Sequence, residues 1–270
     1  MEPVLYQWHF DPLVLLLVLA LMFLHYRLSA RTAPKKNVCF WSAIALILLT
    51  SCSPLHFLAM HVYFSAHMIT HVILLLIAGP LLVISLPAAG SHPVLQYISA
   101  FLGKRSWLAW MAGVGVMWCW HIPAVFEASI APMQHFAAVP LLHTGSMLVA
   151  GALFSWPLVG PSPEQRIHPL SGVLYLFTAC ISCSLLGLLI TFAPLETFRP
   201  YPAFGPAMIG PTMKSMSINP WNLSPAADQQ TAGLIMWVPC CFVYLSACVY
   251  LLLRWFSAPV TFTHPTTQHE

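Results

Sequence analysis

Charged side chains are scarce in this sequence. Only 6% of its 270 residues are Asp, Glu, Lys or Arg, whereas 59% are apolar; soluble domains carry roughly 25% charged residues. So few charges cannot cover a surface that faces water, which excludes an ordinary soluble enzyme. A nucleic-acid-binding protein is excluded as well, because the 10 Lys and Arg are scattered along the chain and form no dense basic cluster.

A secretory signal is also lacking. Residues 1–10 contain Glu2 and no Lys or Arg, whereas a signal peptide starts with a basic region and ends at a small-residue cleavage site. We therefore expect the first helix to remain in the mature protein.

Long apolar runs are what the sequence has in abundance. Each is close to the length of about 20 residues that a helix needs to cross the hydrocarbon core of a bilayer. The sequence therefore predicts an all-α, polytopic integral membrane protein, a bundle of about seven transmembrane helices. We expect one transmembrane domain over residues 1–257, followed by a polar tail at 258–270. The predicted spans are 12–28, 38–54, 62–86, 107–126, 136–156, 170–193 and 231–254.

The basic residues between these runs predict the orientation, because short cytoplasmic loops are enriched in Lys and Arg. If seven helices alternate, only Arg199 and Lys214 fall on one side. This split places the N-terminus outside, the C-terminus in the cytoplasm, and the long loop at 194–230 outside. The basic residues on the predicted cytoplasmic side are Arg27, Arg31, Lys35, Lys36, Lys104, Arg105, Arg166 and Arg254.

The cysteines do not form the framework of a secreted disulfide-rich protein, because most of the eight lie inside apolar runs. Cys180, Cys183, Cys240 and Cys241 lie near the middle of the sixth and seventh runs. Cysteine at such a depth usually behaves as a small apolar residue. We therefore predict packing rather than metal transfer for these four.

Histidines gather in the outer half of the predicted bundle, where an ionisable group is costly and therefore indicates function. His67 and His71 are four residues apart, which places both imidazoles on one face of a helix. His121 and His143, on the next two runs, reach a similar depth at about 1.5 Å per residue. We predict that His67, His71, His121 and His143 converge on a metal or a cofactor.

Further residues are candidates for completing this site. His61 and His135 lie near the outer boundary, and Asp228 precedes the seventh run, where it either caps a helix or hydrogen-bonds a ligating imidazole. Thioether sulfur selects Cu(I), so Met68 beside His67 favours copper. The outer loop also carries methionines that either collect copper or fill space, namely Met208, Met213 and Met216.

The other histidines have an ordinary interpretation. A single membrane histidine often hydrogen-bonds a neighbouring helix or lies at the interface with water. We predict such structural roles for His9, His25, His56, His92 and His168.

Several sequence motifs carry a family resemblance that covers residues 64 to 237. They are FSAHMITH at 64–71, GPLL at 79–82, WCWHIP at 118–123, His143 ahead of LFSWP at 153–157, and DQQTAGLIMW at 228–237. Together these motifs resemble those of the CtaG-like membrane proteins, which are associated with the assembly of terminal cytochrome c oxidase. The resemblance implies a seven-helix, multi-pass protein of the bacterial plasma (inner) membrane that helps to mature a haem-copper oxidase.

The resemblance also implies how this protein acts. We expect a non-enzymatic assembly factor that binds copper at the histidine cluster and delivers it to cytochrome c oxidase subunits, especially subunit I. A periplasmic copper chaperone is an expected partner on the outer side.

Other functions would use much the same residues. Two histidines on facing helices could ligate haem iron in an electron-transfer protein. A copper transporter would need polar groups that continue through the cytoplasmic half, where few occur. An intramembrane metalloprotease is disfavoured, because the sequence contains no His-Glu-x-x-His motif.

Overall fold

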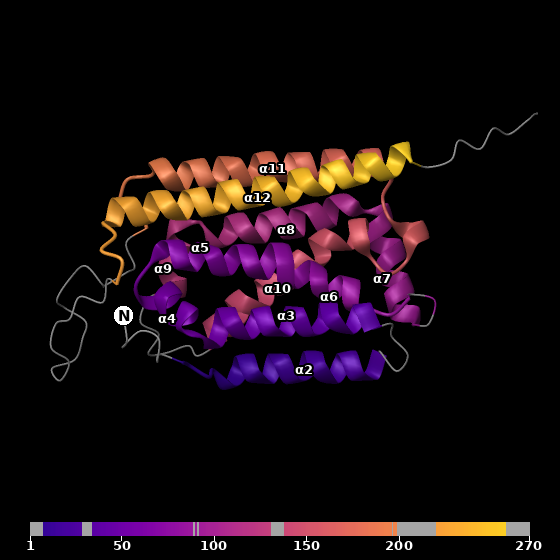
Figure 1. Cartoon of the computed structure of the whole chain (residues 1–270), viewed down its shortest axis with the longest axis horizontal. Helices are drawn as coiled ribbons and strands as arrows, with labels where there is room; N and C mark the ends of the chain where they lie inside the picture. Colours follow the sequence, from indigo (N-terminus) through magenta and orange to yellow (C-terminus); the bar gives the residue numbers. More distant parts are fainter. Residues whose placement is uncertain are drawn as a thin grey trace, which may run out of the picture.

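The computed structural model of this protein describes residues 8–28, 34–88, 90, 92–130, 138–195, 197–198 and 220–257. Every regular element within these ranges is helical, which confirms the predicted all-α class. The long helices run side by side along one direction (Figure 1). Four of the nominated residues lie outside the described ranges, namely His135, Met208, Met213 and Met216.

The helices follow the predicted apolar runs. Five runs correspond to one helix each: α2 (Pro12–Leu28), α3 (Pro34–Cys52), α10 (Ala138–Val159), α11 (Pro169–Phe192) and α12 (Pro225–Phe256). The third run is a continuous helix in three parts: α5 (Phe64–Val72), the π-helix η1 (Ile73–Ala78) and α6 (Gly79–Ser85). The fourth run breaks into α8 (Ser106–Trp120) and α9 (Pro123–Ile130).

Proline sets most of the helix starts. Its fixed φ suits the first turn of a helix, and the N–H that it lacks would have no partner there. The helices that begin on a proline are α2, α3, α9, α11, α12 and the two short helices α4 (Pro54–His61) and α7 (Pro93–Lys104). The many prolines of this chain therefore delimit helices more often than they interrupt them.

Four helical segments are long and apolar enough to cross a membrane: Phe64–Ser85, Leu141–Val159, Pro169–Phe192 and Pro225–Phe256. The pair α3 and α4, bent by 49°, adds a fifth if it forms one broken span. Helix α2 is apolar but has only 17 residues. The chain is thus a helical membrane protein with several apolar helices, while the count of seven spans and the orientation of the termini stay predictions.

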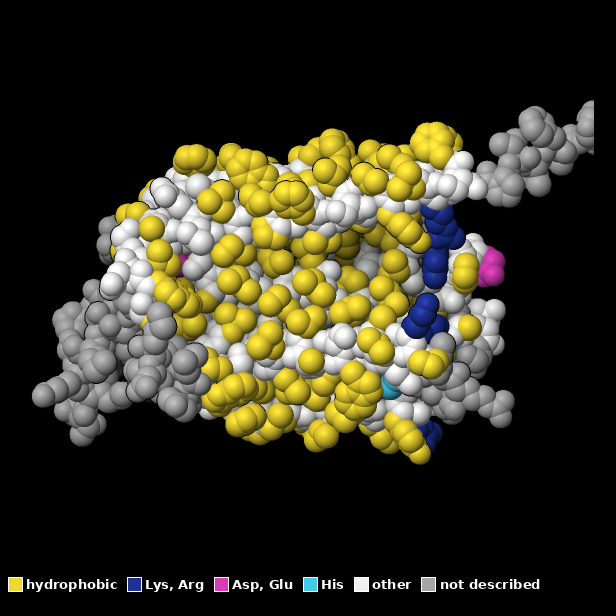
Figure 2. Space-filling model, in the orientation of Figure 1, with side chains coloured by type: hydrophobic (Ala, Val, Ile, Leu, Met, Phe, Trp, Pro, Cys, Tyr) yellow, Lys and Arg dark blue, Asp and Glu magenta, His cyan; other side chains and the backbone are white. Residues whose placement is uncertain are grey.

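The surface of the bundle has the distribution of side chains expected in a bilayer. Figure 2 shows apolar side chains over its flank and Lys and Arg gathered at one end. Arg27 and Arg254 lie in the last turns of α2 and α12, and Lys104 lies in the last turn of α7. These helix ends carry the residues that the sequence assigned to the cytoplasmic side.

Two α-helices, α4 and α7, were not predicted from the sequence. Helix α7 occupies the connection between the third and fourth runs and is tied to α10 by a hydrogen bond from Trp156 Nε1 to Ser99 Oγ at 3.1 Å. Helix α4 follows a break at Ser53, whose hydroxyl accepts a hydrogen bond from Leu55 N. The break turns α4 away from the axis of α3 and places it at the end of the bundle opposite to the basic residues (Figure 1).

A close approach between Gly79 and Gly151 brings α10 against the η1–α6 segment. A Cβ added at Gly79 would lie 2.8 Å from backbone atoms of Gly151, and one added at Gly151 would lie 2.3 Å from Leu75 O. Small residues of this kind let two membrane helices approach backbone to backbone. This crossing holds α10, which carries His143, beside the helix that carries His67 and His71.

Candidate metal centre

Helix α5 carries two of the predicted ligands, and a residue from another helix fixes where it begins. The backbone N–H of Phe64 donates to Asp228 Oδ2 at 2.7 Å, and Ser65 donates to Oδ1 through its N–H at 3.1 Å and through its hydroxyl. Asp228 itself lies in the first turn of α12 and is buried. Its carboxylate is therefore stabilised at the N-terminal ends of two helices. The structure gives Asp228 the role of a cap for α5, and in the described part of the chain its carboxylate accepts from Phe64 and Ser65 and from no imidazole.

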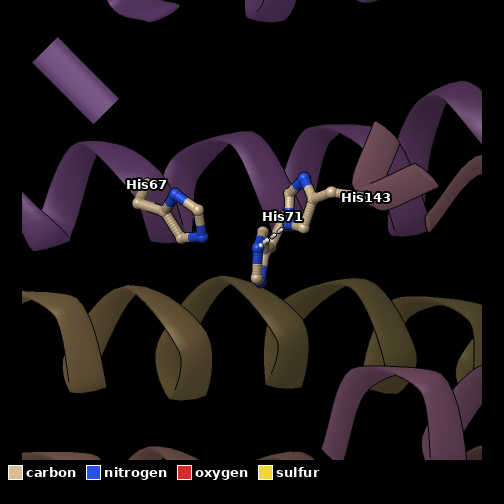
Figure 3. Close-up of side chains that lie close together, drawn as sticks. All are labelled: His67, His71 and His143. Atoms are coloured by element: carbon tan, nitrogen blue, oxygen red, sulfur yellow. Dashed lines mark hydrogen bonds between the residues drawn. The ribbon is translucent and has the colours of Figure 1, made fainter. Parts of the chain in front are cut away.

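Three imidazoles meet between α5 and α10. The ring centroids of His67, His71 and His143 are separated by 4.5 to 5.2 Å, and one nitrogen from each lies within 4.8 Å of the others. Nε2 of His71 is 2.6 Å from Nε2 of His143 (Figure 3). All three side chains are at least nine-tenths buried. We refer to these three residues as the histidine triad.

The triad contains ring nitrogens that the protein does not satisfy. Within the described part of the chain, both nitrogens of His67 and Nδ1 of His71 are buried without a hydrogen-bond partner. Leaving such a group unpaired costs about 1–3 kcal/mol. Nitrogens that bind one metal ion at about 2 Å lie roughly 3.3 Å apart. The observed separations bracket this value, so the residues present fit a small cation.

His121, the fourth predicted ligand, lies beside the triad. It lies at the break after α8, and its ring packs edge-on against His71 at 5.0 Å between centroids. Its Nδ1 is 2.6 Å from Met117 O, and its Nε2 is 3.1 Å from Met68 Sδ. A neutral imidazole has one N–H, which the carbonyl requires at Nδ1. The lone pair on Nε2 therefore faces the thioether of Met68, and a soft cation such as Cu(I) would satisfy both atoms.

The tryptophans of the WCWHIP motif hold this break in place. Trp118 Nε1 donates to Ser182 Oγ on α11, and Trp120 Nε1 donates to Ser146 Oγ on α10, each at 2.8 Å. The Trp120 ring also packs edge-on against His143 at 4.9 Å. The motif thus ties α8 to α10 and α11 beside the histidines.

A cavity of about 20 Å³ lies on the α3–α4 side of the triad. Its lining includes Thr50, His56, Met60, His67 and His143. Sequence reasoning assigned His56 a structural role and missed this position. The sequence feature that could have indicated this position of His56 is the dipeptide Ser53-Pro54, because a helix that starts there changes the direction in which His56 points. We refer to this space as the outer cavity.

The remaining histidines make ordinary contacts. His61 is exposed at the end of α4 and packs against Phe57, so the structure does not bring it to the triad. His25 stacks on Phe40, and His168 Nδ1 accepts a hydrogen bond from Leu170 N at the start of α11. These placements separate the triad from the histidines with structural roles.

Comparison with known proteins identifies the group to which the chain belongs. The family model for the cytochrome c oxidase caa3 assembly factor (Caa3_CtaG) matches residues 8–258. No curated protein and no solved structure matches the chain. The matched segment contains all the described helices and every residue of the triad. The chain therefore belongs to the Caa3_CtaG family of cytochrome c oxidase assembly factors.

Proposed function

We propose that this assembly factor binds Cu(I) at the histidine triad and delivers it to a haem-copper oxidase without catalysing a reaction. The observation that carries the proposal is the convergence of three buried imidazoles, three of whose ring nitrogens have no hydrogen-bond partner among the described residues. An imidazole and a thioether, His121 and Met68, face each other beside the triad. This combination of nitrogen and soft sulfur ligands favours copper over zinc or magnesium.

Membrane position and cavities support a role in transfer. Helix α5, which carries His67 and His71, lies toward the end of the bundle opposite to the basic residues (Figures 1 and 2), and we assign this end to the outer side. The outer cavity, with His56 and Met60 in its lining, would receive copper from a periplasmic copper chaperone. Copper held within the bilayer can pass laterally to a copper centre inside oxidase subunit I. Such transfer needs a site that binds the ion without enclosing it permanently.

A haem-binding function has less support. Two axial histidines must lie on opposite faces of a porphyrin, whereas the nearest nitrogens of His71 and His143 are in hydrogen-bond contact. The outer cavity measures about 20 Å³, and cofactor pockets usually measure about 300–1,000 Å³. A Soret band in the spectrum of the purified protein would restore this alternative.

The test combines metal analysis with complementation. The full chain is purified without oxygen in detergent, loaded with Cu(I), and its copper content is compared with that of His71→Ala, His143→Ala and the exposed control His168→Ala. We expect the two triad variants to lose triad copper and to fail in restoring oxidase activity to a deletion strain. The control should keep the copper and restore the activity. Triad copper that survives both substitutions would overturn the site. Loss of oxidase activity without any bound metal in the wild type would leave the assembly role and remove the copper mechanism.

A further inference from the structure

A second cavity lies on the other side of His71, between α5, α8, α10, α11 and α12. It measures about 10 Å³, roughly the space that one water-sized guest needs. Six side chains in its lining can contact a metal, and five of them carry sulfur. They are His71, Met117, Met147, Cys183, Met236 and Cys240.

The two thiols belong to the lining of the same cavity. Cys183 lies on α11, Cys240 lies on α12, and both are almost fully buried. Cys183 Sγ also lies 3.6 Å from Met117 Sδ, which belongs to α8. Three helices thus bring two thiols and a thioether to the lining of one cavity.

His71 is the independent observation that indicates a ligand here. Its Nε2 is in contact with His143 in the triad, whereas its Nδ1 is buried without a hydrogen-bond partner in the described part of the chain. The same residue lines the thiol cavity. An imidazole that belongs to the triad, borders a group of sulfur atoms and has an unused nitrogen is suited to a metal on either side.

We propose that Cys183, Cys240 and Met117 form a second Cu(I) site, deeper in the membrane than the histidine triad. Thiolate and thioether are soft ligands that select Cu(I). Binding breaks one S–H bond and forms one S–Cu bond, the proton is released to solvent, and copper stays in the Cu(I) state, so no oxidant or reductant is needed.

The charge balance favours one thiolate for each bound Cu(I). One thiolate and one Cu(I) form a neutral pair, and burying a neutral pair in hydrocarbon costs far less than burying a single charge. Met117 and the second thiol can complete the coordination without adding charge. The neighbouring pair Cys180 and Cys241, with sulfur atoms 3.2 Å apart, is more exposed and is not part of the site.

The test uses the full chain in detergent, reduced and loaded with Cu(I) against a competing chelator. The double variant Cys183→Ser/Cys240→Ser is compared with the matched control Cys39→Ser/Cys119→Ser, whose thiols lie on α3 and α8 outside the cavity. We expect the first variant to bind one copper fewer per chain and to lose sulfur scattering in the X-ray absorption spectrum. The control retains both. An unchanged copper count and spectrum in the first variant would overturn the proposal.

Two further measurements keep this test decisive. In His143→Ala, which disables the triad, the sulfur-coordinated copper should remain, so failure of the triad and failure of the thiol site are distinguishable.

If the double serine variant does not fold, the wild type is treated with N-ethylmaleimide with and without Cu(I), and the labelled cysteines are identified by mass spectrometry. Copper should slow the labelling of Cys183 and Cys240 at least about tenfold and leave Cys39 and Cys119 unchanged. Equal labelling of all four with and without copper would overturn the proposal.

Discussion

The carboxylate of Asp228 accepts a hydrogen bond at 2.7 Å from the backbone N–H of Phe64, which lies 164 residues earlier in the chain. This contact joins the first turn of α12 to the first turn of α5. Because His67 lies three residues after Phe64, the position of the triad depends on a residue that need not touch the metal. The contact explains how the DQQTAGLIMW and FSAHMITH motifs act on one site.

We expect Asp228→Ala to destabilise the protein by about 1.5–3 kcal/mol per hydrogen bond lost, because each bond has a charged acceptor. Asp228→Asn should have a smaller effect, since the amide keeps one acceptor oxygen. Thermal unfolding in detergent measures the change, and the exposed Glu164→Gln is the control. Equal melting temperatures for Asp228→Ala and the control would contradict a capping role.

The crossing of α10 and α6 provides a test of helix position. Gly151→Ala places a methyl group 2.3 Å from Leu75 O, so the helices must separate and move His143 away from His71. We expect a loss of about 1–3 kcal/mol in stability together with weaker copper binding. Gly145→Ala, on the same helix, meets no atom within 4 Å and is the matched control. A stable Gly151→Ala protein with normal copper content would show that the close approach is not needed.

The contact between His121 and Met68 predicts a specific role for sulfur. Met68→Leu keeps the volume of the side chain and removes the thioether, so the fold should persist while Cu(I) affinity falls roughly 10–100-fold, the range for groups that support metal ligands. Competition with a Cu(I) chelator measures the affinity. The exposed Met111→Leu should leave it unchanged. The interpretation fails if both leucine variants bind copper alike.

The position of His56 in the outer cavity predicts that its substitution changes the rate of copper loading and not the amount of copper bound. If copper reaches the triad through this cavity, His56→Ala should slow loading while the final copper content of the triad stays the same. Stopped-flow transfer from a Cu(I) chelator measures the rate, with the exposed His61→Ala as control. Identical loading curves for the two variants would rule out this access route.

The sequence alone predicts the helices of this protein well, because apolar runs bounded by proline determine them locally. It also predicts the approach of His67, His71 and His143, since spacing and depth follow from regular helix geometry. Rotation of a helix about its axis does not follow from depth. Nε2 of His121 is directed at Met68 because the helix breaks just before Pro123, and a residue before proline is disfavoured in helical conformation.

Contacts between segments distant in sequence could not be predicted from apolar runs and helix geometry, because they depend on how the helices pack. Asp228 could be recognised as a cap, but the helix that it caps depends on how α12 packs against α5. The sequence predicts that Cys183 and Cys240 are packing residues, because cysteine near the middle of an apolar run usually behaves as a small apolar residue. Only the pairing of α11 with α12 shows that both line a cavity beside His71.

The π-helical segment η1 limits how the chain can vary in length. It lies between His71, which belongs to the triad, and Gly79, which contacts α10. Its wider turn accommodates one more residue than an α-helical turn does, and each residue rotates a helix by about 100°. Deleting one residue here would therefore convert the π-helical turn into an α-helical turn and leave His71 and Gly79 in their present orientations, whereas inserting one residue would rotate one against the other. A related sequence that lacks one residue between these two positions should consequently keep the same centre on an uninterrupted α-helix.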